Sequence, residues 1–309
     1  MSQIPPRALV LLGILTVVWG TNWSLFPLAM REISVWTFRS ISLGGAGMLL
    51  LMTARLRGQS IAIPRSYWPI IAVSSFFFLF VWNIASAYSA ILIPSGQSAI
   101  LGFSMPLWSA LISWVVLREP IPPRLLVALM LGASAIGLLI APGLHAYAQA
   151  PLGFGAGLCA GLSWAIGTLV LKRHPTPVSA VVLTGWQLLI TSVPITAIAF
   201  TLGDGHWFMP SWTSLAVITY ITLVPMSVGN VCWFEIVGLL PANVAGLSSV
   251  MIPIVAMLTG AIAHGEPLGL WQLLAMGCSV SSLALVMLRP ASKISLTQPT
   301  CIDSPKSRR

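Results

Sequence analysis

The feature that most constrains this chain is a set of long stretches without any Asp, Glu, Lys or Arg. They cover residues 66–117, 125–171, 174–203, 205–234 and 236–265. An apolar helix of about 20 residues crosses the hydrocarbon layer of a bilayer, so the longest stretches can hold two spans joined by a short turn. Only 7% of the residues are charged, against roughly a quarter in soluble domains. The sequence therefore predicts an all-α, multi-pass protein of the cell membrane.

Clusters of Pro and Gly, such as "LIPSG" and "LGDG", divide the apolar sequence into ten transmembrane helices. The predicted spans are 8–28, 33–53, 69–90, 95–117, 123–141, 152–171, 178–200, 213–236, 241–263 and 269–288. We expect them to form a single transmembrane domain over residues 1–290. The polar residues 291–309 then form a disordered, basic, cytoplasmic tail.

The distribution of basic residues predicts that both termini are cytoplasmic. With the N-terminus inside, the inner side receives thirteen of the fifteen Lys and Arg residues. These are Arg7, Arg55, Arg57, Arg65, Arg118, Arg124, Lys172, Arg173, Arg289, Lys293, Lys306, Arg308 and Arg309. Basic residues collect in cytoplasmic loops, which also explains the net charge of +9 without a nucleic-acid partner.

The two halves of the chain share residues at a fixed separation. Pairs 147 positions apart include Asn83 and Asn230, Pro94 and Pro241, Pro106 and Pro253, and the Glu-Pro pairs at 119–120 and 266–267. Near the start of each half, Trp19 and Trp164 are 145 positions apart. We therefore predict two copies of a five-helix unit, over residues 7–143 and 150–290.

Because five is an odd number, the second copy must enter the membrane from the opposite side. The loop charges reverse accordingly: Arg118 and Arg124 follow the fourth span, whereas the loop after the ninth span has no Lys or Arg. Inverted-topology repeats are typical of secondary transporters, whose substrate site lies near the midplane between the repeats. This predicts transport by alternating access.

The chain resembles the drug/metabolite transporter superfamily, and within it the ten-helix EamA-type transporters. The resemblance rests on "VVWGTNW" in the first span, "WTFRSISLGG" in the second, and a P-x12-E-P pattern that closes the fourth and ninth spans. It covers about residues 7–290. Among the members, the chain is most similar to YddG-type amino acid exporters, which implies export of neutral and aromatic amino acids across a bacterial inner membrane.

Polar and aromatic residues recur on single faces of the spans, as at Trp19, Asn22 and Trp23, where the spacing is that of one helix face. Uncompensated amides in hydrocarbon are costly, so they face protein or a water-filled cavity. The candidate substrate-binding residues are Trp19, Asn22, Trp23, Trp82, Asn83, Ser86, Gln97, Phe103, Ser104, Trp108, Trp164, Asn230 and Trp233. For the Asn and Ser members, hydrogen bonding between helices is the alternative. The family resemblance implies that aromatic residues of spans 1, 3, 4 and 6 shape the central cavity.

Two charged residues and two prolines complete the candidate site. Arg39 in the second span either extends to the membrane interface or binds a substrate carboxylate. Glu235, at the end of the eighth span, is either a solvated helix-end acid or a proton carrier. Pro106 and Pro253 occupy equivalent positions within spans, and we predict matching bends that act as a gate.

The function predicted is export of small neutral or aromatic amino acids, or similar metabolites, through an aromatic, amide-lined cavity. Proton-coupled efflux of drugs or toxic compounds is one alternative, and exchange of sugar phosphates or nucleotide sugars is another. Phosphate binding needs Lys or Arg in the path, and apart from Arg39 the spans have none. There is no H-E-x-x-H or G-x-S-x-G motif and no metal-ligand spacing, so we expect no enzyme, metal site or cofactor. The expected partners are the substrate and the lipid bilayer, and the expected state is a monomer.

Overall fold

The computed structural model describes residues 6–116, 118, 120–140, 150–204, 209–239, 251–265 and 268–287. Glu119, Pro241, Glu266, Pro267 and the tail over 291–309 lie outside the described residues. Every regular element in the described part is helical. The prediction of an all-α, multi-pass membrane protein is therefore confirmed.

Within the described residues, seven helical segments are long and apolar enough to cross a membrane. They are Pro6–Ala29, Val35–Leu56, Arg65–Leu92, Gly96–Val115, Pro151–Arg173, Ala180–Leu202 and Trp212–Ile236. Two shorter apolar helices cover Pro123–Leu138 and Ile252–Ala263. The number of ten spans, the inverted repeat and the cytoplasmic location of both termini stay predictions.

The elements of the first half are α1 (Pro6–Ala29), α2 (Val35–Leu56), η1 (Arg65–Tyr67), α3 (Trp68–Ser75), η2 (Phe76–Val81), α4 (Trp82–Leu92), α5 (Ser95–Gly102), α6 (Met105–Val115) and α7 (Pro123–Ile140). Those of the second half are α9 (Pro151–Arg173), α10 (Ala180–Leu202), α11 (Trp212–Ile221), η4 (Thr222–Gly229), α12 (Asn230–Leu239), α14 (Met251–His264) and α15 (Leu270–Met287). Both η2 and η4 are π-helical segments inside otherwise α-helical spans.

Local sequence signals explain where several helices begin and end. Ser34, Ser179 and Ser211 have extended backbone dihedrals, and each side-chain hydroxyl accepts a backbone N–H three residues later, at the start of α2, α10 and α11. Ser is a favoured residue at this N-cap position, because its oxygen satisfies an otherwise free helix donor. At the end of α2, Gly58 has φ +72° and stops the helix in a left-handed conformation that glycine adopts at little cost.

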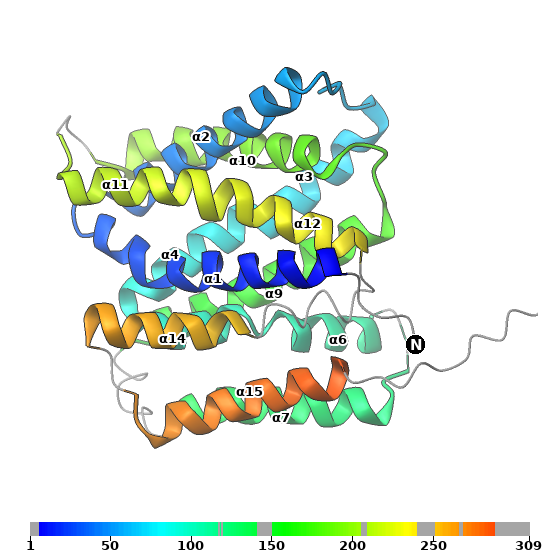
Figure 1. Cartoon of the computed structure of the whole chain (residues 1–309), viewed down its shortest axis with the longest axis vertical. Helices are drawn as coiled ribbons and strands as arrows, with labels where there is room; N and C mark the ends of the chain where they lie inside the picture. Colours follow the sequence, from blue (N-terminus) through cyan, green and yellow to red (C-terminus); the bar gives the residue numbers. More distant parts are fainter. Residues whose placement is uncertain are drawn as a thin grey trace, which may run out of the picture.

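The most extensive helix contact joins α2 to α10 (Figure 1). The two helices are antiparallel: the Ser34 N–H before α2 donates to the Asp204 carboxylate after α10, at 3.1 and 3.2 Å, and the Ser179 hydroxyl before α10 donates to Gln59 after α2 at 2.9 Å. A Cβ at Gly47 would lie 2.8 Å from the backbone nitrogen of Leu189. Such close backbone approach is the known use of small residues in membrane helix packing.

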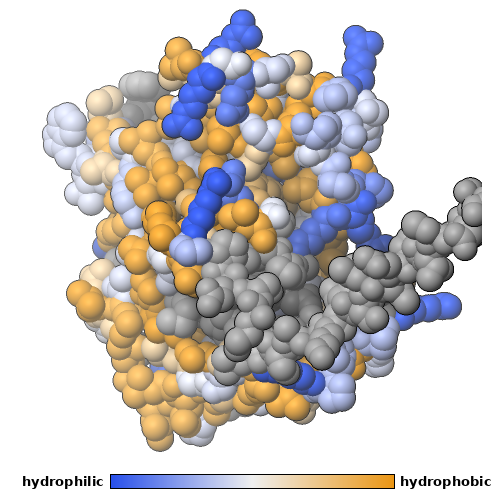
Figure 2. Space-filling model, turned by 45° about the vertical axis from the view of Figure 1, so that its right-hand side comes forward, coloured by the Kyte–Doolittle hydropathy of each residue, from blue (hydrophilic) through white to orange (hydrophobic). Residues whose placement is uncertain are grey.

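The remaining helices surround a central layer. Helix α1 packs on α14, α11 and α12, whereas α9 packs on α4, α5 and α6. Helices α7 and α15 form a pair at the edge of the bundle (Figure 1). Figure 2 shows apolar residues over most of the flank, with strongly hydrophilic side chains gathered toward the end that faces right in Figure 1. The buried residues of α1, η2, α4, α9, η4 and α12 meet in one core, where the candidate site lies.

Candidate functional site

A small enclosed cavity lies where both halves of the chain meet. Its walls are Trp19, Asn22, Trp23, Phe26, Arg39, Leu79, Trp82, Asn83, Ser86, Phe103, Trp164, Met226 and Asn230. The free volume for the centre of a water molecule is about 20 Å³, which is room for about one water. Nine of the thirteen uncharged residues predicted to bind substrate line this cavity, together with the charged candidate Arg39.

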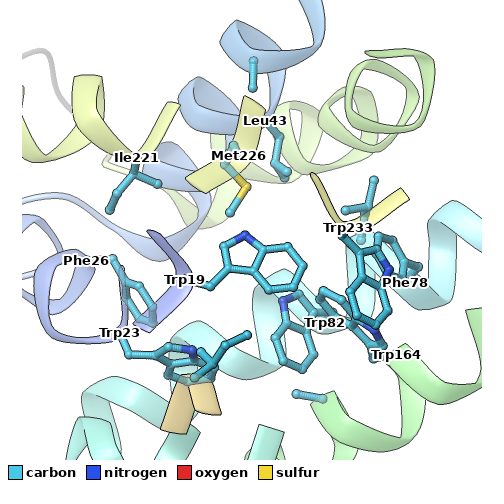
Figure 3. Packing of buried hydrophobic residues seen from close by; sticks show 14 of the residues in the cluster. Trp19, Trp23, Phe26, Leu43, Phe78, Trp82, Trp164, Ile221, Met226 and Trp233 are labelled. Atoms are coloured by element: carbon cyan, nitrogen blue, oxygen red, sulfur yellow. The ribbon is translucent and has the colours of Figure 1, made fainter. Parts of the chain in front are cut away.

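Six of the thirteen wall residues are aromatic, and Trp19 lies at the centre of the aromatic cluster (Figure 3). Its ring centroid lies 5.2 Å from that of Trp164, in an edge-to-face arrangement, and 5.9 Å from that of Trp233. Trp82 and Trp164 are closer still, at 4.3 Å. Pairs of this kind contribute about 0.5–1.5 kcal/mol each beyond the burial of their area. The layer is therefore a stable packing unit as well as a wall.

Two of the three asparagines of the site, Asn83 and Asn230, each follow a π-helical segment and bond to its backbone. The Asn83 side-chain amide donates to the Leu79 carbonyl at 2.8 Å, and the Asn230 amide donates to the Met226 carbonyl at 2.9 Å. A π-helical turn displaces backbone carbonyls from the regular α-helical pattern and is frequent at functional sites. Each asparagine thus satisfies a backbone acceptor beside the cavity, and the arrangement is the same in both halves.

Arg39 is buried, with 1% of its surface exposed. Its Nε donates to the Asn83 backbone carbonyl at 3.2 Å, and its guanidinium carbon lies 5.0 Å and 5.4 Å from the ring centroids of Phe26 and Phe38. The Arg39 side chain therefore lies inside the protein, which favours the alternative in which it contacts the substrate. Helix α2 packs on α4, and the Arg39 guanidinium forms part of the cavity wall between them.

The two matching tryptophans differ in their hydrogen bonds. The Trp19 indole N–H donates to the Pro225 carbonyl of η4 at 3.1 Å. The Trp164 indole N–H is buried and has no partner among the described residues, although the Phe78 ring centroid lies 4.3 Å from its own. Phe78 occupies the position 147 residues before Pro225. The indole N–H therefore has an acceptor at Trp19 in the first half, and none among the described residues at Trp164 in the second half.

A second, larger cavity of about 420 Å³ lies between α9, α10 and α12. Leu171, Lys172, Leu183, Gln187 and Glu235 are among its walls. Trp233, Phe78 and Phe234 also border it, and the first two of these contact Trp164. A layer of aromatic rings therefore separates this cavity from the central one.

Several predicted residues lie away from the central cavity. Trp233 borders the larger cavity and contacts the central layer from that side. The Trp108 indole N–H donates to the Ser104 hydroxyl at 3.1 Å, one helical turn beyond the cavity, and Gln97 is partly buried on α5. Ser104 lies between α5 and α6, where the helix is interrupted, and this break separates Phe103 from the residues that follow it.

Glu235 forms an ion pair with Arg7, with 2.8 Å between Oε2 and Nη2, and 32% of its side-chain surface is exposed. This favours the solvated helix-end acid over the proton carrier. Pro106 lies in the first turn of α6, directly after the interruption that follows Gly102. Pro253 lies in the first turn of the described part of α14, and residues 240–250 before it lie outside the described residues. The role of both prolines as a gate stays a prediction.

Leu79 and Met226 are wall residues that were not among the predicted site residues. They are 147 positions apart, and each lies four residues before a predicted asparagine and accepts its side-chain amide. Applying the repeat offset to the i−4 neighbours of Asn83 and Asn230 would have identified them. Their apolar side chains gave no signal in the sequence, because it is their backbone carbonyls that accept the asparagine amides.

A sequence model of the EamA-like transporter family matches residues 7–141 and 151–288. The chain therefore belongs to this family, which makes it a multi-pass membrane transporter and not an enzyme. It is 26% identical over 293 residues to the uncharacterized transporter YvbV of Bacillus subtilis (strain 168), covering 93% of each chain. It is 24% identical over 282 residues to a probable amino-acid metabolite efflux pump of Escherichia coli (strain K12), covering 84% of this chain and 87% of that one. These relatives support the predicted location in a bacterial inner membrane.

One solved crystal structure matches 91% of this chain and 97% of its own, with a TM-score of 0.70 and 17% identity. At this identity the likeness concerns the fold alone. The fold described here is therefore one that an experimental structure already contains.

Proposed function

We propose that this transporter exports small neutral or aromatic amino acids, or similar metabolites, from the cytoplasm by alternating access. The observation that carries the proposal is the convergence of Trp19, Asn83, Trp164 and Asn230, two from each half, on one buried cavity. Aromatic faces suit an apolar side chain or an ammonium group. Amide groups suit the polar end of an amphipathic solute. The efflux pumps among the relatives are named for amino-acid metabolites, which agrees with this substrate class.

The packing of the helices supports two inverted repeats. Helices α2 and α10, which are the second helix of each unit, pack on each other in antiparallel orientation. Hydrogen bonds from Ser34 to Asp204 and from Ser179 to Gln59 join their ends. Helix α1 packs on α14 and α12, and its counterpart α9 packs on α6 and α4, the counterparts of those helices. Exchanging the two units therefore leaves this pattern of contacts unchanged. Inverted repeats of this kind rock around a fixed central site in alternating access.

The central cavity is too small for an amino acid, since it accommodates about one water. The larger cavity lies on the side of Lys172 and Glu235, which the charge distribution assigns to the cytoplasm. We infer that substrate enters there and that the aromatic layer of Trp164, Trp233 and Phe78 must separate to admit it. The structure then corresponds to a state that is closed at the centre and accessible from the cytoplasmic side.

Of the two alternatives, proton-coupled drug efflux requires a titratable acid in the path. Glu235 is the only acidic wall residue of either cavity among the described residues, and it is paired with Arg7. Exchange of sugar phosphates requires a cation in the path, and Arg39 supplies one. A single guanidinium matches one negative charge, whereas a phosphate monoester carries about two at neutral pH. The amino acid proposal therefore accounts better for the site.

The test is transport by purified protein in liposomes, with a panel of radiolabelled amino acids supplied with and without a proton gradient. Trp19→Ala and Trp164→Ala should reduce transport by at least about tenfold, equivalent to ~1.4 kcal/mol. Trp212→Ala is the matched control, because that ring is 86% exposed. Size-exclusion profiles establish that each variant is folded. Exchange of a sugar phosphate without transport of any amino acid would refute the proposal, as would full transport by both cavity variants.

A further inference from the structure

Arg39 is a buried cation without an anionic partner in the described part of the chain. The acidic side chains of that part are engaged elsewhere: Glu32 accepts the Ser211 N–H, Asp204 accepts the Ser34 N–H, and Glu235 pairs with Arg7. Among the residues that the structure describes, the Arg39 side chain makes one hydrogen bond, from Nε to the Asn83 carbonyl. Its Nη1 is buried and has no partner among those residues. An uncompensated charge within a membrane span is costly and marks a functional site.

The surroundings of Arg39 fix the direction in which an anion could approach. The rings of Phe26 and Phe38 lie 5.0 and 5.4 Å from the guanidinium carbon, and the Asn83 carbonyl occupies Nε. The guanidinium also belongs to the wall of the central cavity. Its free Nη1 donor is therefore available to a group inside the cavity. A carboxylate suits it, because guanidinium–carboxylate hydrogen bonds are charge-assisted and directional.

The same cavity contains free acceptors. Asn22 Oδ1 and Asn83 Oδ1 are buried and have no hydrogen-bond partner in the described part of the chain, and both residues line the cavity with Arg39. Amide oxygens accept hydrogen bonds from an ammonium group, and the nearby Trp faces attract it. The Arg39 donor is complementary to a carboxylate, and the two asparagine acceptors are complementary to an ammonium group. A zwitterion carries both groups, and its apolar side chain can lie against the tryptophans.

We propose that Arg39 binds the carboxylate of the substrate, and that Asn22 and Asn83 receive its ammonium group, so that the site selects zwitterionic α-amino acids. This inference rests on the proposed function and adds the chemical group by which the site selects its substrate. One guanidinium neutralises one carboxylate, so substrate binding compensates the charge of the empty site. Arg39 is then a specificity-determining residue, and the second half of the chain has no equivalent charge. The residue 145 positions after Arg39 is Thr184. The same offset relates the N-cap residues Ser34 and Ser179.

The decisive experiment uses the wild-type protein, so it does not depend on the folding of a variant. Liposomes preloaded with L-phenylalanine take up radiolabelled L-phenylalanine, and unlabelled analogues compete. Phenylalaninamide lacks the carboxylate, and 3-phenylpropionate lacks the ammonium group. We expect phenylalaninamide to compete at least about tenfold more weakly than phenylalanine, since charge-assisted bonds are the strong ones. Equal competition by the amide would overturn the role of Arg39 while leaving the proposed function intact.

Failure of this exchange, with an equal failure across the amino acid panel, would instead refute the proposed function, and the inference with it. Competition by glucose 6-phosphate stronger than that by phenylalanine would also overturn the inference. Thermal unfolding provides a second readout that needs no transport. Phenylalanine should raise the melting temperature of the wild type, and phenylalaninamide at the same concentration should raise it much less.

Two variants test the residue directly. Arg39→Gln should abolish the preference for phenylalanine over phenylalaninamide, and Arg39→Lys should restore part of it, because Lys retains the charge without the planar fork. Arg57→Gln, at the exposed end of α2, is the matched control and should keep the wild-type preference. A purely structural role would lower transport of both compounds equally. An unchanged preference in Arg39→Gln would refute the proposal.

Discussion

The two halves of the molecule differ in packing at matching positions beside the two cavities. In the first half, Phe26 and Phe38 are 1% and 0% exposed and fill the space beside Arg39. The positions 145 residues later are Leu171 and Leu183, which border the 420 Å³ cavity. A leucine fills less volume than a phenylalanine, and these positions are closely packed in the first half but border a cavity in the second. The comparison teaches that matching positions of the two halves need not be packed alike.

The central tryptophans add a second difference. Trp19 donates its indole N–H to the Pro225 carbonyl, whereas the Trp164 N–H is without a partner in the described structure. A buried donor without a partner carries a free-energy penalty. The indole N–H of Trp19 therefore avoids this penalty in the state described, whereas that of Trp164 does not. If the halves exchange conformations during transport, the Phe78 carbonyl is the equivalent acceptor for Trp164.

The largest expected effect comes from opening the closed end. Phe26→Ala should lower the free energy of unfolding by about 3–5 kcal/mol, because it leaves a void in a packed aromatic cluster. Phe200→Ala is the control and should change it by less than about 0.5 kcal/mol, since Phe200 is 87% exposed. Thermal or denaturant unfolding in detergent measures both. Equal stability of the two variants would show that the first half is not held closed by this packing.

The reciprocal change fills the open end. Leu171→Phe copies Phe26 into the second half and should lower transport from that side about tenfold, or ~1.4 kcal/mol, by narrowing the cavity. Stability should hardly change, because the cavity has room for the added ring. Leu202→Phe, at the end of α10 where the side chain is 62% exposed, is the control for the same substitution. Unchanged transport in Leu171→Phe would exclude this cavity from the substrate path.

A smaller effect separates the two tryptophans. Trp19→Phe removes the N–H that the Pro225 carbonyl accepts and should cost about 1 kcal/mol more than Trp164→Phe, the typical net value of one hydrogen bond. The loss of ring volume is the same at both positions and cancels in the comparison. The Asn230 amide lies 3.4 Å from the same carbonyl and limits the penalty. The two melting temperatures give the answer, and a larger loss for Trp164→Phe would reverse the assignment of the satisfied half.

The smallest effect concerns the loop between α1 and α2. The Glu32 carboxylate accepts the Ser211 backbone N–H at 2.9 Å, and this bond, followed by hydrogen bonds from the Ser211 and Ser214 side chains, lowers the pKa of Glu32 below its ordinary value of 4.5. A lowered folded-state pKa stabilises the fold above the ordinary pKa, and the contribution is lost as the pH falls through the folded value. Wild-type protein should therefore lose slightly more stability than Glu32→Gln between pH 7 and pH 4. Parallel melting curves would show that the bond contributes nothing.

The positions of the helices and the membership of the cavity wall were largely predictable from the sequence. A backbone in hydrocarbon must satisfy its own hydrogen bonds, so long uncharged stretches dictate helices. An amide beside a Trp on one face must avoid lipid, which is why the sequence grouped Trp19, Asn83 and Trp164, and all three line one buried cavity. The helix interruption between α5 and α6 was not predictable in detail, and it moved Ser104 and Trp108 away from the cavity.

The sequence by itself determined that this chain is a multi-pass helical protein with two similar halves, because hydrophobic length and residue spacing are local properties. Only the tertiary structure decided where Arg39 lies. A long cationic side chain in a span can reach either the interface or the interior, and the choice depends on the helices packed around it. The same holds for the free Trp164 N–H and the cavity at Leu171 and Leu183. These features follow from how the two halves pack against each other, and a single stretch of sequence does not contain that information.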